Sequence, residues 1–249
     1  MSRPVFLKLG GSILTDKDKP NSFRRPVAKR LFTEIRKSGV PLVLFHGAGS
    51  FGHPQAMKWK LGEKVVTPER RAGVATILAT VAKLHAEVLG VADAAGLKPI
   101  SVPVHLDTVS EGGVLVDLPV RRIKALMADG FTPVLHGTLV RDDEWGWRVA
   151  SADELMAELA ADLNPCLGMF VTDVDGVLQG DSVMERVESV EQVAPLGRTD
   201  ATGAMSGKVQ HGLIMADSCP VLIVNGLERG RVNDALRGKP VIGTRLGVA

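Results

Sequence analysis

The chain has 249 residues, of which 45% are hydrophobic and 23% are charged, and its formal net charge is +2. This length and apolar content can bury one large core or two packed lobes, so we expect a globular protein. The near-neutral charge excludes the basic excess that coats a nucleic-acid backbone, so we expect no nucleic-acid partner.

Short runs rich in leucine and β-branched residues, bounded by glycine or proline, recur along the chain. Each run has the length and composition of a buried strand. The predicted strands cover residues 5–9, 41–45, 99–104, 132–135, 167–172 and 221–224. Two polar stretches, residues 110–117 and 140–149, are instead predicted to form hairpins.

Predicted helices lie between most of these strands. One opens at Pro26, which lacks the amide that a first helical turn leaves unpaired, and ends before Gly39, which tolerates a left-handed conformation. A longer helix follows and stops at Gly96. A third begins at Ser151, where the serine hydroxyl and the Glu154 carboxylate can each satisfy an unpaired backbone amide.

This alternation of strands and helices predicts an α/β fold, namely a three-layer αβα sandwich with a mainly parallel central sheet. No linker or internal repeat interrupts the sequence, so residues 1–249 are expected to form a single domain. Ligands of such sheets bind in the loops at the carboxyl ends of the strands. Those loops therefore hold the candidate site.

The two cysteines, Cys166 and Cys219, match no metal-ligand spacing and no disulfide framework of a secreted protein. We interpret both as small buried hydrophobic side chains in a reducing, cytoplasmic protein. The apolar run that ends at Leu9 is too short for a signal peptide, and other runs fall short of the ~20 residues that cross a membrane. We therefore expect no membrane partner.

The first candidate loop is Gly10-Gly11-Ser12, and Lys8 precedes it in the strand. Paired glycines let the backbone approach a ligand and present amides to phosphate oxygens. The loop lacks the glycine spacing of the Walker and dinucleotide-binding motifs, and a tight strand-to-helix turn would explain it equally well.

The second candidate loop spans residues 46–54, HGAGSFGHP, after the second strand. Three glycines, a serine and two histidines give a flexible anion-binding nest with titratable donors. We interpret His46 as a hydrogen-bonded structural histidine, because it still belongs to the apolar run. His53 lies at the far edge of the loop, where it can donate to a bound anion.

Two further loops carry charged groups. Residues 199–208 are mostly small or hydroxylated, and they lead into a helix that carries Lys208. Lys208 could bind a phosphate, or it could be an ordinary solvated lysine on the helix surface. Residues 172–176, TDVDG, could accept hydrogen bonds from ribose hydroxyls or form a plain acidic turn.

Taken together, the segments KLGGS, HGAGSFGH, TDVDG and TGAMSGK resemble the amino acid kinase superfamily in order and spacing. Within that superfamily, GSFGH is similar to isopentenyl phosphate kinases and fosfomycin kinases rather than to acetylglutamate, aspartate or uridylate kinases. The resemblance spans essentially the whole chain. It implies an acceptor-binding lobe at about residues 1–165, an ATP-binding lobe at about residues 166–249, magnesium bound with ATP, and a homodimer.

The resemblance also implies the roles of individual residues. The residues expected to bind ATP are Lys8, Gly10, Gly11, Ser12, Gly49, Asp173, Gly176, Gly203 and Lys208. The residues expected to bind the phosphate acceptor are Ala48, Gly52, His53 and Ala152. The expected catalytic residues are Lys8, Lys17, His53, Asp153 and Lys208. Asp153 would orient the lysines, although a charge that stabilises the helix dipole would explain it as well.

The implied reaction is ATP-dependent phosphorylation of isopentenyl phosphate, or a related prenyl monophosphate, to the diphosphate in isoprenoid biosynthesis. A fosfomycin kinase-like enzyme and a nucleotide-sensing regulatory protein remain alternatives. The chain departs from the family at Ala152 and Ala204, where glycine is usual, and at Thr138, where aspartate is frequent. Each alanine is expected to bring a methyl close to the phosphates.

The prenyl tail would need an apolar wall. Residues at the start of the long helix, Ala72, Gly73, Val74 and Ile77, could provide one. Core packing or a dimer interface is the favoured explanation of the same stripe, because an apolar helical face normally contacts protein.

Overall fold

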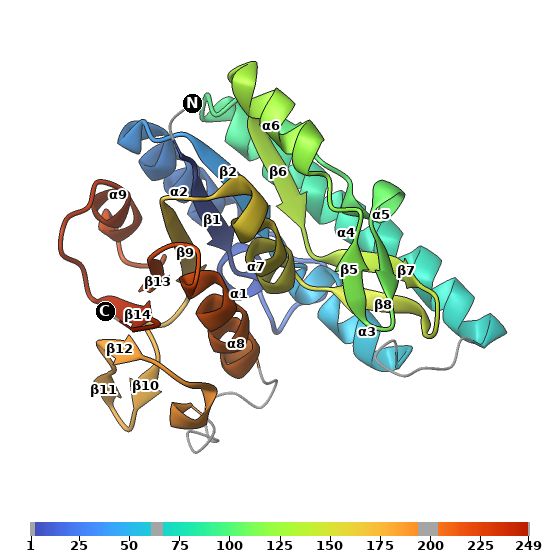
Figure 1. Ribbon diagram of the computed structural model, residues 1–249. Coiled ribbons are helices and arrows are strands. Elements are labelled where there is room, and N and C mark those ends of the chain that lie inside the picture. The colour runs from blue at the N-terminus through green and yellow to red at the C-terminus, as the bar shows by residue number, and fades with distance from the viewer. Residues whose placement is uncertain (1–2, 61–66, 194–203, 249) are drawn as a thin grey trace.

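The computed structural model describes residues 3–60, 67–193 and 204–248. An eight-stranded sheet forms its centre, with the strand order β12-β14-β13-β9-β1-β2-β6-β3 (Figure 1). β13 and β14 pair antiparallel, and the other neighbouring strands run parallel. These strands are β1 (Val5–Leu9), β2 (Leu42–His46), β3 (Pro99–Ser101), β6 (Thr132–His136), β9 (Leu167–Thr172), β12 (Arg186–Val187), β13 (Val221–Asn225) and β14 (Gly243–Leu246).

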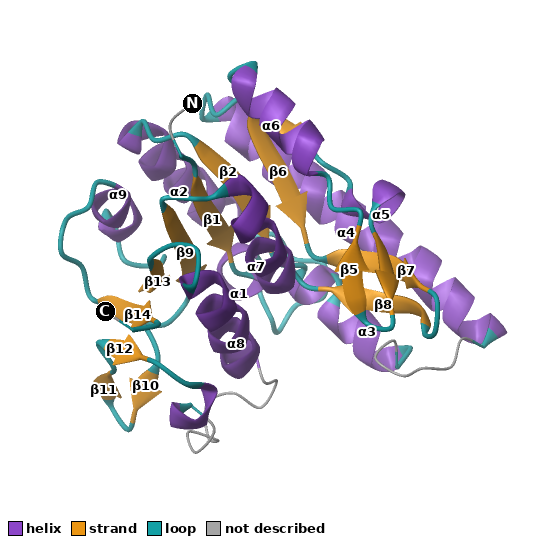
Figure 2. Ribbon diagram, in the orientation of Figure 1, coloured by secondary structure: helices purple, strands orange, loops and turns teal. Residues whose placement is uncertain are grey.

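Helices cover both faces of this sheet (Figure 2). One apolar cluster lies under α2, α4 and α9, and a second lies under α6, α7 and α8. The predicted three-layer sandwich with a mainly parallel sheet is therefore confirmed. These helices are α2 (Arg25–Ser38), α4 (Pro68–Ala94), α6 (Val120–Ala128), α7 (Ala152–Leu163), α8 (Ala204–Ala216) and α9 (Arg231–Leu236).

Smaller elements surround the sheet and confirm both predicted hairpins. β4 pairs antiparallel with β5, and β7 pairs antiparallel with β8. Those strands are β4 (Val109–Glu111), β5 (Val114–Val116), β7 (Thr138–Asp142) and β8 (Gly146–Ala150), and a separate ribbon consists of β10 (Leu178–Gln179) and β11 (Ser182–Val183). The short helical segments are α1 (Gly11–Leu14), α3 (His53–Lys58), α5 (Val104–Asp107), η1 (Gly49–Phe51) and η2 (Val190–Gln192).

Side chains of β1 alternate between the two faces of the sheet. Leu7 and Leu9 join the cluster under α2 and α4, whereas Phe6 joins the cluster under α7. Lys8 is two residues from Phe6 and therefore projects on the α7 side. The alternation of a single buried strand thus brings an ammonium group to the start of α7.

The predicted helix ends are confirmed, and one predicted strand is too long. Gly39 follows α2 with a φ of 72°, and Ser151 and Glu154 form the capping box of α7. The strand expected over residues 99–104 ends earlier, two residues before Pro103, which precedes α5. Proline has no amide to donate to a neighbouring strand, so pairing stops there.

Two further expectations from the sequence need correction. Cys219 is buried as predicted, but Cys166 is exposed. Cys166 lies directly before β9 at the protein surface, and its amide donates to the Pro4 carbonyl at 2.8 Å. The second correction concerns α4, which by length and composition alone is apolar enough to cross a membrane. Nine of its residues are buried, and the core helix of a globular protein meets the same criteria.

Candidate functional site

The two glycine-rich loops that follow β1 and β2 lie against each other. A Cβ atom on Gly11 would lie 2.5 Å from Gly49 Cα, and one on Gly47 would lie 2.8 Å from the Gly11 nitrogen. Any side chain at Gly11 or Gly47 would push the loops apart, so their close approach requires glycine. The contact gathers backbone amides from two strand ends into one small area.

Thr15 joins these loops through its hydroxyl. Thr15 Oγ1 donates to the Gly11 carbonyl at 2.7 Å and accepts from the Ser50 amide at 3.0 Å. Sequence reasoning missed this residue, because one buried threonine after a short helix forms no distinctive pattern. Its position after the Gly10-Gly11-Ser12 turn was the only available signal.

Several backbone amides around the loops find no partner among the described residues. Within the part of the chain that the structure describes, the amides of Gly11, Ser12 and Ala48 donate to no protein atom, and neither do those of Ala152 and Asp153 at the start of α7. Unpaired amides in glycine loops and at helix starts favour bound anions. The arrangement suits phosphate groups.

A buried charge cluster lies at the start of α7. Lys8 Nζ is 2.5 Å from Asp153 Oδ1, and the two side chains are only 8% and 13% exposed. Burial lowers the pKa of Lys8 to about 8, with Asp153 opposing the shift and Lys208 adding to it. Burial alone would raise the pKa of Asp153, but the charges of Lys8 and Lys208 hold it below its ordinary value. The structure therefore brings the three predicted residues together.

His53 begins α3 at the far end of the second loop and is exposed. Partial loss of hydration lowers its pKa, and the charges of Lys8 and Lys208 lower it further, whereas Asp153 opposes the shift. His53 is thus close enough to Lys8 and Lys208 for their charges to shift its pKa. In the absence of an anion we expect its ring to be neutral near pH 7.

The loops after β1 and β9 are joined by side chains. Ser12 Oγ donates to Asp173 Oδ1 at 2.7 Å, and Thr172 Oγ1 donates to the same oxygen at 3.2 Å. The Ser12 hydroxyl is therefore engaged with protein, which leaves its amide for a phosphate. One Asp173 oxygen is occupied in the same way, so a ribose hydroxyl would have to bind the other.

The end of the TDVDG loop has structural roles. Asp175 accepts from Arg231 and, at 3.1 Å, from Asn225 Nδ2. Gly176 is buried, and a Cβ there would lie 2.8 Å from Val183 Cγ1. Packing alone is sufficient reason for glycine at this position, and its expected place beside the nucleoside stays a prediction.

Three predicted site residues do not join the cluster. Lys17 is exposed in the turn after α1, and among the described residues no contact links it to Lys8 or Asp153. Gly203 lies outside the described residues. The methyl of Ala152 is buried in the core cluster under α7, so this departure from the family packs against protein.

The expected wall of the prenyl tail is only partly assembled. Gly73, Val74 and Ile77 are buried, but Ala72 is exposed and does not share their face. Val74 and Ile77 form a small apolar cluster that includes Trp59 and reaches the second glycine loop through Ala48. A Cβ on Gly73 would lie 2.7 Å from Trp59 Cδ2, so glycine lets the indole lie directly on α4.

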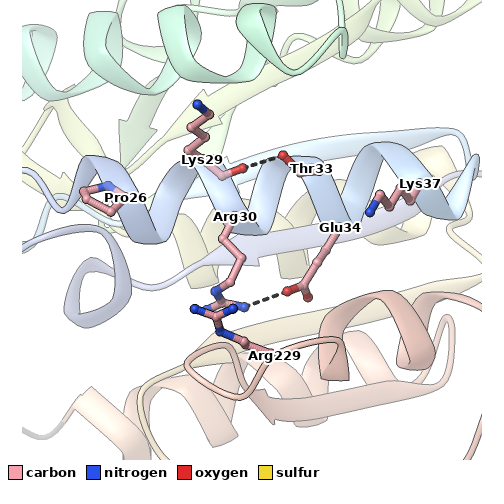
Figure 3. A pocket seen from close by; sticks show the side chains of 7 residues that line it. All are labelled: Pro26, Lys29, Arg30, Thr33, Glu34, Lys37 and Arg229. Atoms are coloured by element: carbon pink, nitrogen blue, oxygen red, sulfur yellow. Dashed lines mark hydrogen bonds and ion pairs between the residues drawn. The ribbon is translucent and has the colours of Figure 1, made fainter.

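A hollow of about 470 Å³ lies elsewhere, on the outer side of α2 (Figure 3). Arg30 donates to Glu34 Oε1 at 2.7 Å and to the Gly226 carbonyl, which fastens α2 to the end of β13. The hollow shares no residue with the glycine loops or the charge cluster. Its lining consists of Pro26, Lys29, Arg30, Thr33, Glu34, Lys37 and Arg229.

The strand order, the paired glycine loops and the buried Lys8–Asp153 pair define an α/β protein built to bind phosphate groups. The amino acid kinase family matches residues 3–225, and the chain belongs to this family. The isopentenyl phosphate kinase of Methanothermobacter thermautotrophicus is 30% identical to it over 97% of this chain and 98% of its own length. That of Methanocaldococcus jannaschii is 28% identical, with coverage of 97% and 98%.

A solved structure of isopentenyl phosphate kinase also resembles this chain closely. The TM-score is 0.87 at 29% sequence identity, and the match covers 97% of this chain and 99% of that chain. The family resemblance and the fold expected from the four motifs are therefore confirmed.

Proposed function

We propose that this chain transfers the γ-phosphoryl group of ATP to isopentenyl phosphate, forming isopentenyl diphosphate for isoprenoid synthesis. The observation that carries the proposal is the buried Lys8–Asp153 pair, with 2.5 Å between Lys8 Nζ and Asp153 Oδ1. Beside it lie two glycine loops with amides that donate to no atom of the described residues. Relatives that match nearly the whole chain are named for this reaction, which supports the choice of phosphate acceptor.

The geometry suits phosphoryl transfer. The transition state of this reaction is loose and spreads negative charge over equatorial oxygens, so catalysis consists mainly of alignment and charge stabilisation. We assign Lys8 and Lys208 to the transferring group and Asp153 to holding the lysines in register. No dedicated base is needed, because the second pKa of a phosphate monoester is about 6 and its oxygen is already a nucleophile.

Magnesium is part of the proposal. Among the described residues, no group of three or more His, Cys, Asp or Glu side chains is arranged to hold a metal ion. We infer that Mg²⁺ arrives with ATP and takes most of its ligands from phosphate oxygens and water, as this ion commonly does. Bound there, it would neutralise part of the charge that Lys8 and Lys208 face.

We infer further that the protein acts in the cytoplasm as a homodimer. An exposed stripe of small side chains on α4, at Ala75, Ala79, Ala82 and Ala86, is compatible with close packing against a second copy. Light scattering of the purified protein would measure the mass directly, and a monomer at micromolar concentration would contradict the dimer.

The function is tested by ADP release with Mg²⁺–ATP and a panel of phosphate acceptors. We expect turnover with isopentenyl phosphate and much weaker turnover with fosfomycin or uridine monophosphate, and ³¹P NMR should show a new diphosphate product. Preferred turnover of fosfomycin would establish the fosfomycin kinase alternative. ATP binding without turnover of any acceptor would instead support a nucleotide-sensing protein.

A further inference from the structure

Three buried histidines form a stack behind the second glycine loop. His46 and His136 end the neighbouring strands β2 and β6, where they are register partners. Alternation along the strands turns both side chains toward α4, away from the cluster that holds Phe45 and Leu135. His85 of α4 completes the stack, with ring centroids 5.2 Å from His46 and 4.5 Å from His136.

The hydrogen bonds of this stack define where its protons lie. A carbonyl oxygen only accepts, so the 3.1 Å contact between His46 Nδ1 and the Gly47 carbonyl places a proton on Nδ1. In a neutral ring His46 Nε2 is then an acceptor, and His85 Nδ1, 2.9 Å away, donates to it. His85 Nε2 in turn accepts from the Ser101 hydroxyl at 2.8 Å. One chain of donors runs from Ser101 through both rings to Gly47.

The rings of His46 and His85 are both held in the neutral form that these hydrogen bonds require. Burial, together with His136 and His85, keeps the pKa of His46 well below its ordinary value. Burial and His136 lower the pKa of His85 to about 3. Both rings therefore keep the same neutral tautomer across the pH range in which an isolated histidine would titrate.

These hydrogen bonds determine the orientation of the peptide between Gly47 and Ala48 in the loop. The peptide between Gly47 and Ala48 is trans, so its carbonyl and its amide point in opposite directions. Because the Gly47 carbonyl is directed at the His46 ring, the Ala48 amide points away from the histidine stack. Within the described residues this amide donates to no protein atom. Its orientation leaves it available to an anion in the loop.

We propose that Ser101, His85 and His46 are positioning residues that keep the Ala48 amide turned toward the phosphate of the acceptor. This inference rests on the proposed function, since it assigns that phosphate to the second loop. None of the three side chains needs to touch the substrate. A Nδ1-protonated His46 holds the peptide, and His85 fixes that tautomer because it presents a donor to Nε2.

The test combines ring-nitrogen NMR with binding measurements on the full chain. Long-range ¹H–¹⁵N spectra should show His46 protonated on Nδ1 in the wild-type protein. His85→Phe keeps a stacked ring but removes both nitrogens, and it should abolish the single His46 tautomer. We expect the affinity for isopentenyl phosphate, measured by calorimetry, to fall about tenfold, as for loss of one net hydrogen bond. The affinity for ATP should change by less than about twofold.

Two further variants separate positioning from packing. Ser101→Ala removes the first donor and should change tautomer and acceptor affinity in the same direction but less, which covers the case of an unfolded His85→Phe protein. Val88 lies one turn from His85 on the same buried face of α4. Val88→Ala is therefore a control for any loss of stability in His85→Phe, because it leaves the hydrogen bonds of Ser101, His85 and His46 in place. It should leave both affinities unchanged in the folded protein.

Distinct results would overturn the inference. If NMR shows that His46 is protonated on Nε2 in the wild-type protein, the proposed hydrogen bonds from Ser101 to Gly47 are excluded. This result does not depend on which substrate the enzyme phosphorylates. Equal losses of ATP and acceptor affinity in His85→Phe, or the same losses in Val88→Ala, would show that the histidines serve only packing. Wild-type protein that binds isopentenyl phosphate but does not turn it over would contradict the proposed function and leave this test intact.

Discussion

Lys8 Nζ lies 2.5 Å from Asp153 Oδ1, although 145 residues separate the two in sequence. The lysine comes from the middle strand of the sheet and the aspartate from the first turn of α7. Neither residue could be buried alone, because an isolated ionised side chain in a low-dielectric interior is strongly unfavourable. Together with Lys208, they place two ammonium groups and one carboxylate in a single buried cluster, an arrangement that suits a phosphate group.

Asp153→Asn should fold normally and lose activity. Ser151 and Glu154 still cap α7, so the helix start is preserved. The lost carboxylate leaves Lys8 and Lys208 without the charge that holds them, and we expect kcat to fall on the order of 10²-fold, as for removal of one preorganised charge-stabilising group. Steady-state kinetics and circular dichroism would measure both effects.

Asp162→Asn is the matched control for this substitution, since Asp162 is an exposed aspartate near the end of the same helix. It should leave kcat unchanged. An Asp153→Asn enzyme with wild-type turnover would show that Asp153 only stabilises the helix dipole.

The lowered pKa of Lys8 predicts a descending limb in the pH profile. Since that pKa is about 8, kcat/KM for ATP should fall as pH rises through about 8, when the free enzyme loses the ammonium. Bound ATP raises the pKa of Lys8 through its negative charge, so the limb in kcat should lie at higher pH. A kcat/KM that stays flat up to pH 9.5 would contradict the role of Lys8.

Unfolding does not account for such a limb. The folded pKa of Lys8 lies below its ordinary value of 10.5, so between about pH 8 and 10.5 the unfolded state binds more protons than the folded state. The contribution of Lys8 to stability therefore rises with pH in this window. Melting curves recorded across the same range would separate activity from stability.

How much of this site was predictable depends on the type of contact. The capping box at Ser151 and the strand that carries Lys8 follow from local patterns, and both are confirmed. Their meeting in space does not follow from any local pattern, and the pairing of Lys8 with Asp153 came only from family resemblance. The His46–His85 contact was missed because it depends on the rotation of α4 over the sheet, which periodicity does not determine.

Gly11→Ala tests whether the two glycine loops must touch. The new Cβ would lie 2.5 Å from Gly49 Cα, and backbone cannot yield as a flexible side chain does. We expect unfolding free energy to drop by about 1–3 kcal/mol, as for overpacking of a tight contact. ATP affinity should weaken at least tenfold, because the amides of both loops would move. Chemical denaturation and calorimetry measure the two quantities.

Gly90→Ala provides a control of opposite sign. Gly90 is exposed in α4, and a Cβ there meets nothing within 4 Å. Alanine has the higher helix propensity, so this variant should gain about 0.5–1 kcal/mol without changing ATP affinity. If Gly11→Ala binds ATP as well as wild type does, close contact of the loops is not needed for the nucleotide.

The pKa of His53 predicts proton uptake when the acceptor binds. Partial loss of hydration and the charges of Lys8 and Lys208 lower the pKa of His53, so we expect a neutral ring in the free enzyme near pH 7. A dianionic phosphate held beside the ring reverses this balance, because an opposite charge within a few ångströms favours the charged form. Calorimetry of isopentenyl phosphate binding in buffers of different ionisation enthalpy should therefore show uptake of a fraction of a proton near pH 7.

His53→Ala should abolish that uptake and weaken acceptor binding, whereas ATP affinity changes little. A hydrogen bond to a charged group contributes about 1.5–3 kcal/mol, which corresponds to roughly a 10- to 150-fold loss in acceptor affinity. His53→Gln keeps a donor but cannot take up a proton, so it should recover part of the affinity and none of the uptake. If ATP affinity collapses in His53→Ala, the histidine serves the nucleotide or the fold. If uptake persists without His53, another group titrates, and Lys8, whose pKa is about 8, is the first to be tested.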